Sequence, residues 1–259
     1  MKKKIPGIII LAFCLVLVLA ATSACYAVGN AVSDAVTAVI EEVNFAIDDY
    51  SNFGEAIHMF DMPADLVSHL DINLRVNAIR LISTNDTNIR IAYTPSLRGN
   101  YVVPQVEGAI VDGRLSVTEE PASQLTNING GVLRIYVPRN LSLNTLNMST
   151  YAGAISIFEG GYLADTVTLR ASAGAISIED FTAISIIAET TSGLVTARGL
   201  NAISLNMQTS AGAIFLSDSS IEGELTATTS VGAINISNVD ADFDNANIST
   251  SVGIVNINP

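Results

Sequence analysis

The sequence predicts an all-β protein, a β-solenoid with turns of about 20 residues, preceded by irregular β-strands and an N-terminal membrane or signal helix. Three observations predict this fold class. The 259-residue chain has 18 glycines, no Trp and only 6% aromatic residues, a composition that suits short strands of small side chains. One phrase recurs with small changes, as "SAGAISI", "SAGAIFL" and "SVGAINI". Segments such as "GRLSVTEE" alternate apolar and polar residues, which is typical of half-buried strands.

Residues 1–32 are predicted to be a signal anchor or signal peptide. "MKKK" precedes an uncharged run from Ile5 to Val32, long enough to cross a bilayer as a helix. The lysines favour the cytoplasmic side, so everything downstream is expected on the extracytoplasmic side. Cleavage near Ala24 or Ala27 would instead release a secreted protein, and lipidation at Cys25 would make it a lipoprotein. Both cysteines lie in this run, so the exported body has no disulfide.

Residues 33–65 are predicted to form a short amphipathic helix and a linker. Apolar residues recur at helical spacing from Val32 to Ile47. The following stretch, "SNFGEAIHMFDMPADLV", has no clear period, and its Met59, Phe60 and Met62 are candidates for a lid on the next domain. A β domain over residues 66–259 then begins with strands in "DINLRVNAIRLIS", "NIRIAYTP", "GRLSVTEE" and "GVLRIYVP".

Regular repeats are predicted over residues 141–259. Glycines recur at intervals of 21, 19, 19, 20 and 21 residues, and we predict that they form structural corners: Gly153, Gly174, Gly193, Gly212, Gly232 and Gly253. At such a corner, glycine would adopt a positive φ or allow neighbouring turns to approach closely. A fixed period of this length is the signature of stacked turns.

Apolar residues stand at four positions of each repeat, two and four residues after the glycine and five and seven before it. Each repeat therefore holds two short strands with one face inward, whose equivalents stack in register. An outward row lies four residues before each glycine: Ser149, Arg170, Glu189, Gln208, Thr228 and Ser249. Such a row suits either a sugar or peptide ligand or a solvated face. A meander or sandwich of hairpins is the alternative architecture.

Three segments carry a family resemblance: "VEGAIVDGRLSVTEE", "GVLRIYVPRNLSLNTLNMSTYAGAISI" and the serial "TSxG-x-I-x-I" phrases. From about Leu66 to Pro259 the chain resembles the bacterial putative-adhesin family of β-strand-repeat domains, a domain of unknown function related to the toastrack-type domains of cell-envelope stress proteins. The resemblance implies an exported, often membrane-tethered β-solenoid. It implies no catalytic residues. Family members commonly have "SGD" or "SGN" at the corner, where this chain has mostly "AGA" or "VGA".

The charge pattern excludes nucleic acid as a partner. The formal net charge is −13, and no Lys or Arg follows Arg198, so a polyanion would be repelled. Enzyme activity and a cofactor are not expected either. His58 and His69 have no nucleophile or ligand at a recognisable spacing, and no phosphate-binding or dinucleotide motif occurs. A carbohydrate-active enzyme with paired carboxylates remains a distant alternative.

Asp240, Asp242 and Asp244 alternate in "NVDADFDNANIS" and are a candidate calcium site. The positions that an EF-hand loop gives to Gly and Glu hold Asn245 and Ser251 here. An acidic connection between two strands is therefore the simpler interpretation.

These features predict a membrane-tethered, non-enzymatic β-solenoid at the bacterial cell envelope, acting as an adhesion-type or binding module for an unknown protein or glycan. The alternative is an envelope-stress or regulatory scaffold that docks a partner membrane protein. The last repeat, "VGIVNINP", has little visible cap. An open strand edge of this kind invites pairing, which predicts self-association through the end of the solenoid.

Overall fold

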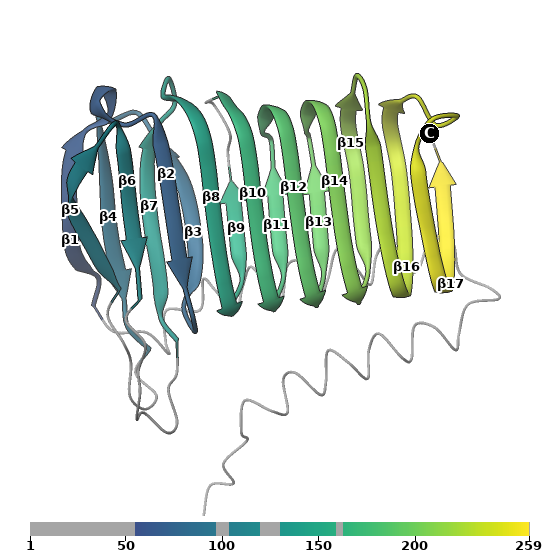
Figure 1. The fold of residues 1–259 in the computed structure, drawn as a ribbon, viewed down its shortest axis with the longest axis horizontal. Coiled ribbons are helices and arrows are strands. Elements are labelled where there is room, and N and C mark those ends of the chain that lie inside the picture. Colours follow the sequence, from purple (N-terminus) through teal and green to yellow (C-terminus); the bar gives the residue numbers. More distant parts are fainter. Residues whose placement is uncertain (1–54, 97–103, 120–129, 159–162, 259) are drawn as a thin grey trace, which may run out of the picture.

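A computed structural model of the chain describes residues 55–96, 104–119, 130–158 and 163–258 (Figure 1). These residues form an elongated β-solenoid with the earliest strands at one end and the last strands at the other. The predicted fold class is confirmed for this part of the chain. The predicted N-terminal membrane helix and the amphipathic helix after it lie outside the described residues.

Each regular turn consists of a long strand, the glycine corner and a shorter strand. The long and short strands are β8 (Ser142–Ala152) and β9 (Ile155–Phe158), β10 (Leu163–Ala173) and β11 (Ile176–Glu179), β12 (Thr182–Ser192) and β13 (Val195–Arg198), and β14 (Asn201–Ala211) and β15 (Ile214–Ile221). In the last two turns, β16 (Leu225–Ala241) and β17 (Asn247–Asn258) run through the corner as continuous strands.

Equivalent residues of successive turns are paired in parallel register. Arg170 pairs with Ser149 on one side and with Glu189 on the other, and Ile176 pairs likewise with Ile155 and Val195. Successive rungs therefore lie about 4.8 Å apart along the solenoid axis. This in-register stacking is what the recurring phrases encode, and it rules out a meander of hairpins for these repeats.

The N-terminal strands extend the solenoid in an order that differs from the sequence. Strands β2 (His69–Leu74) and β3 (Ala78–Thr84) form one turn, and β6 (Arg114–Thr118) and β7 (Val132–Pro138) form another. Strand β2 lies between β6 and β8, and β3 lies between β7 and β9, all in parallel. The first turn of the chain is thus enclosed by two turns that come later.

Three antiparallel strands complete this end. Strand β4 (Asn88–Thr94) pairs with β7, and β5 (Gln105–Val111) pairs with β6. Strand β1 (Ile57–Pro63) pairs with β4, which corrects the linker predicted for the end of residues 33–65. The edge of β4 offers backbone partners to a segment that is too short to show a period of its own. Met62 is buried, and Met59 and Phe60 pack on the core as the lid prediction proposed. A short 3-10 helix, Ala64–Leu66, then leads into the solenoid.

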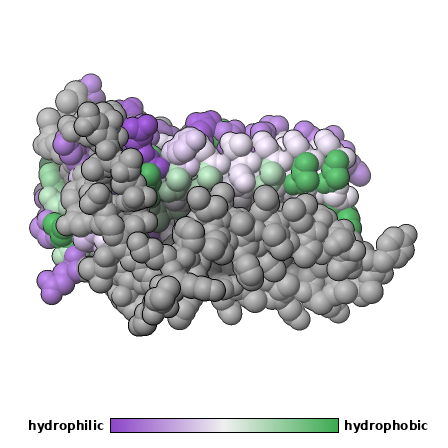
Figure 2. All heavy atoms as spheres, turned by 90° about the horizontal axis from the view of Figure 1, so that it is seen from below, coloured by the Kyte–Doolittle hydropathy of each residue, from purple (hydrophilic) through white to green (hydrophobic). Residues whose placement is uncertain are grey.

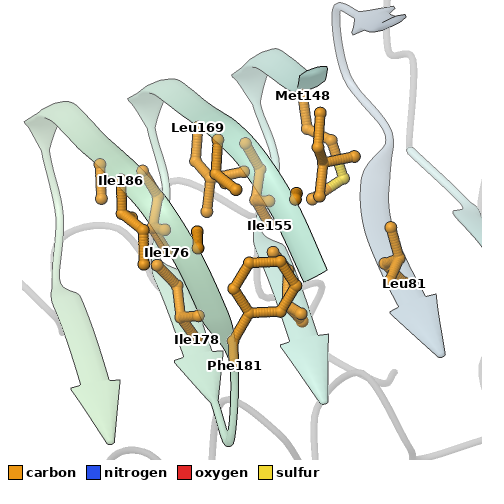
Figure 3. Close-up of a cluster of buried hydrophobic side chains, with 14 of the residues drawn as sticks. Leu81, Met148, Ile155, Leu169, Ile176, Ile178, Phe181 and Ile186 are labelled. Carbon is orange, nitrogen blue, oxygen red and sulfur yellow. The ribbon is translucent and has the colours of Figure 1, made fainter. Parts of the chain in front are cut away.

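The core lies between the layer of long strands and the layer of short strands. Met148, Leu169 and Ile186 point into it from the long strands, and Ile155 and Ile176 from the short strands (Figure 3). In the first five repeats, all four predicted apolar positions are at most 1% exposed. The last repeat differs, because Val255 and Ile257 are 37% and 44% exposed and no other described turn packs over them.

Candidate functional site

The glycine corner has a backbone that other residues cannot adopt. Five of the six predicted corner glycines have φ between +151° and +157°: Gly174, Gly193, Gly212, Gly232 and Gly253. A Cβ atom built on any of these five would lie within 2.0 Å of the carbonyl oxygen of the preceding corner glycine. At Gly153 a Cβ would lie 2.5 Å from the carbonyl oxygen of Asn77. The missing side chain therefore allows successive corners to approach closely.

A row of threonines, buried in every turn except the last, forms hydrogen bonds to these corners. Three residues before the glycine, the Thr190 hydroxyl donates to the carbonyl of Gly174 at 3.1 Å, and Thr209 donates to Gly193 at 3.3 Å. Thr229 and Thr250 repeat the contact in the following turns. These hydroxyls supply a partner to the corner carbonyls. This row was not predicted from the sequence, although a Thr stands at this position in every repeat except the second, which has Ala171.

Two rows of half-buried or exposed residues, one on either side of the threonines, line a groove of about 1000 Å³ along the solenoid axis. One is the outward row predicted from sequence, four residues before each glycine: Ser149, Arg170, Glu189, Gln208, Thr228 and Ser249. The other stands two residues before each glycine: Tyr151, Ser172, Thr191, Ser210, Ser230 and Ser251. The structure therefore gathers the predicted row into one concave site that spans all six repeats.

The regular part of the groove is rich in hydroxyl groups and carries little charge. Arg170 Nε donates to Glu189 Oε2 at 2.8 Å, so the two charged residues of the rows form a pair. The remaining members of the rows are Ser, Thr, Tyr and Gln. Tyr151 is 68% exposed, and its ring is accessible to a ligand. The site can thus offer many neutral hydrogen-bond donors and acceptors and one aromatic surface.

Glu119 closes the N-terminal end of the groove as a structural residue. It is 8% exposed, and its Oε2 accepts hydrogen bonds from the Arg75 backbone N–H at 2.8 Å and from Asn77 Nδ2 at 3.1 Å. Asn77 Oδ1 in turn accepts from the Tyr93 hydroxyl at 3.0 Å. This carboxylate stabilises the 75–77 corner through these hydrogen bonds, which gives Glu119 a structural role at the groove.

A second corner, not recognised in the sequence, lies six residues after each glycine. Its residues have φ of +50° to +65° in four successive turns: Asp180, Gly199, Asp218 and Asn238. Asp, Asn and Gly are the residues that enter this left-handed region most readily. These four positions share a preference for positive φ and not a single residue type, so the repeat is not visible in the sequence as one recurring residue.

Hydrogen bonds link the side chains of this second corner. Asn238 Nδ2 donates to Asp218 Oδ1 at 2.7 Å, and Arg198 Nε donates to Asp218 Oδ2 at 3.2 Å. The Asn238 bond, followed by the charge of Arg198, lowers the pKa of Asp218 below its ordinary 3.8. Burial raises the pKa of nearby Glu179, against the opposing charge of Arg198.

The calcium candidates do not assemble into a site. Asp240, Asp242 and Asp244 are all exposed, and the Asp242 carboxylate accepts from Asn245 Nδ2 at 2.7 Å. Within the described ranges, no group of three His, Cys, Asp or Glu side chains is arranged to hold a metal ion. The segment is an acidic connection between β16 and β17.

The other singled-out residues lie apart from one another. His58 is exposed on β1, and His69 on β2 has its Nδ1 2.8 Å from the Thr145 hydroxyl. Cys25, the lipidation candidate, lies outside the described residues. In the portion of the chain that is described, no helix has the length and apolarity needed to span a membrane.

The stacked parallel turns and the open polar groove along one corner place the protein in the class of β-solenoids. The chain belongs to the Toastrack DUF4097 family, whose model matches residues 67–258. This match confirms the family resemblance drawn from the sequence. Among curated proteins, none matches the chain significantly.

Several solved bacterial structures are similar to this chain. A putative cell adhesion protein from Clostridium sporogenes has 10% identity and a TM-score of 0.46, over 79% of this chain and 98% of that one. A putative adhesin from Bacteroides fragilis has 15% identity and a TM-score of 0.46, over 79% and 97%. A putative adhesin from Parabacteroides distasonis has 13% identity and a TM-score of 0.44, over 79% and 98%.

Proposed function

We propose that the protein is an exported, membrane-tethered and non-enzymatic binding module of the cell envelope, of the adhesion type, and that its corner groove holds a linear, uncharged polysaccharide. The observation that supports this is the continuous groove lined by two hydroxyl-rich rows across six repeats. The membrane tether is supported by the uncharged run from Ile5 to Val32 after three lysines.

The chemistry of the groove favours a neutral glycan over a charged ligand. The Arg170–Glu189 pair leaves the two rows without net charge, while the whole chain carries −13. An acidic polymer would therefore meet a repulsive field and no unpaired cation in either row. Hydroxyl groups repeated at strand spacing, together with the amide of Gln208, match a chain of sugar hydroxyls. The exposed Tyr151 ring offers a surface for the apolar face of one sugar.

Binding of the purified full-length chain to neutral and acidic soluble polysaccharides, measured by calorimetry, tests the proposal. We expect saturable binding to a neutral polymer, with little change in Kd as salt is raised, since no ion pairs form. Tyr151→Ser and Gln208→Ala should each weaken binding several-fold, because an aromatic surface or a hydrogen bond is lost. Asn201→Ala, in the same strand as Gln208 but outside the groove, should leave Kd unchanged.

Two results would contradict the proposal. Equal Kd values for the three variants and the wild type would place any glycan site elsewhere. Failure of the wild type to bind any polysaccharide would favour the alternative function, a scaffold that docks a partner membrane protein.

A further inference from the structure

We propose that the C-terminal end of the solenoid docks against the same end of a second copy of this chain, forming a two-fold symmetric dimer through β17. The inference rests on the end of the solenoid and is independent of the groove and of its ligand.

Strand β17 has an open backbone edge. Among the described residues it pairs with β16 alone. In the inner turns, the corner glycine and the residue two positions later donate to the next turn, as in Gly212 N to Val231 O and Val195 N to Ala213 O, both at 3.0 Å. The equivalent N–H groups of Gly253 and Val255 point toward the side where no further described strand follows. They form a ready template for another strand.

The sequence of β17 lacks the features that usually protect such an edge. Its 12 residues, "NISTSVGIVNIN", include no Asp, Glu, Lys, Arg or Pro, and its pairing with β16 has no register shift. The opposite end of the molecule is protected. There β1 carries Asp61 and Pro63 and a register shift between His58 and Phe60, and β5 is also irregularly paired. Charges, proline and bulges are the devices that prevent strand addition.

The cross-section of the core is also uncovered at this end. Val255 and Ile257 are 37% and 44% exposed, whereas the equivalent core positions of the preceding turn, Ile234 and Ile236, are buried. In the part of the surface that Figure 2 leaves uncovered, apolar residues are visible near the C-terminal end of the turns. Unpaired strand edge and apolar surface thus coincide, which is the combination that association would bury.

A second copy is the occupant that fits these observations. The chain carries a net charge of −13, and β17 is an uncharged strip on which two such chains can meet without direct repulsion between side chains. The first described strand, β1, lies at the opposite end of the solenoid (Figure 1). Among the described strands, the N-terminal end offers no edge that is equally regular and uncharged. Head-to-tail growth is therefore disfavoured and the contact closes as a dimer.

Sedimentation velocity of the full-length chain over a range of concentrations tests this proposal. The edge variant is Val255→Lys/Ile257→Lys. Its matched control is Ile184→Lys/Ile203→Lys, which replaces two side chains that are similarly exposed, at 48% and 50%, away from the end. We expect a concentration-dependent dimer for the wild type and the control, and a monomer for the edge variant, with unchanged circular dichroism.

Hydrogen exchange of the wild type provides a second measurement that does not depend on the folding of a variant. The amides of Gly253 and Val255 should be protected at high concentration and should lose protection on dilution. A monomer with unprotected edge amides would overturn the proposal. Protection that is independent of concentration would also overturn it, in favour of the chain's own N-terminal segment as the cover. A dimer that persists in the edge variant, or growth beyond a dimer, would do the same.

Discussion

The two corners of each turn impose different demands on single residues. At the first corner a φ near +155° and a carbonyl oxygen in the place of a Cβ both require glycine, as at Gly212. At the second corner a φ near +50° is accessible to Asp and Asn, and the side chain of Asp218 gains bonds to Arg198 and Asn238. The first corner thus has no room for a side chain. At the second corner, the side chain forms hydrogen bonds to the neighbouring turns.

Gly212→Val should destabilise the fold by about 4 kcal/mol or more, because backbone strain adds to a clash with the Gly193 carbonyl. The control is Ser210→Val, at an exposed position two residues earlier, which should change the stability by less than about 0.5 kcal/mol. Urea unfolding followed by circular dichroism measures both. Similar midpoints for the two variants would contradict the role assigned to the corner glycine.

The residue-level predictions from sequence succeeded where one residue type recurs. The spacing of the glycines identified the first corner because no other residue can occupy it. The second corner was missed because Asp180, Gly199 and Asn238 look unrelated until their common φ is known. The groove was foreseen only as one row, since the sequence does not reveal how strongly the chain bends at Gly212 and its equivalents.

At the scale of the element, the second corner links neighbouring turns through a titratable contact. Asp218 belongs to the turn after Arg198 and the turn before Asn238. Its carboxylate therefore connects three successive turns, and its ion pair with Arg198 forms only while it is ionised. The bonds that lower the pKa of Asp218 are thus bonds between neighbouring turns.

Asp218→Asn should lower the melting temperature slightly at neutral pH and reduce its acid dependence. Since the folded pKa lies below the ordinary 3.8, the ionised group stabilises the fold fully above that value. The contribution is lost as the pH falls through the lower, folded pKa. Melting curves from pH 2 to 7 for both proteins check this expectation. Parallel curves, with the same offset at every pH, would show that the carboxylate does not contribute through its charge.

Strand positions were predictable from alternation, but the order of the turns was not. Alternation shows which residues of "DINLRVNAIRLIS" face inward, yet it carries no information on which strand becomes a neighbour. The placement of β2 between β6 and β8 depends on contacts between residues 45 and 76 positions apart. Strand β1 was missed for a related reason. It forms because the edge of β4 supplies its backbone hydrogen-bond partners, and the residue pattern of β1 alone does not predict this pairing.

For the whole molecule, stacking in register makes the inner turns interchangeable. Thr182 pairs with Asn201, so residues 182–200 form one complete turn. Deleting them joins Phe181 to Asn201 in the same relation that Phe181 has to Thr182. In a solenoid, stability is a sum over turns and their interfaces, so the shortened chain should still fold.

We expect the 182–200 deletion to unfold cooperatively, with a smaller urea m-value because less surface is exposed. The control deletion, 182–191, removes half a turn and takes the next corner glycine out of alignment with the stack. It should not give native-like circular dichroism. If both deletions fold equally well, equivalence of whole turns is not what holds the repeats together.

The enclosed position of the β2–β3 turn has a consequence for the order in which the protein acquires its structure. That turn cannot be completed until β6, β7 and β8 have been made, so the N-terminal third requires slow, long-range assembly. Every later turn pairs only with its neighbours, so each one can add rapidly once the turn before it has formed. A chain that emerges N-terminus first would finish its difficult nucleus before the repeats arrive. Among the described strands, β17 would then be the last to add to the stack.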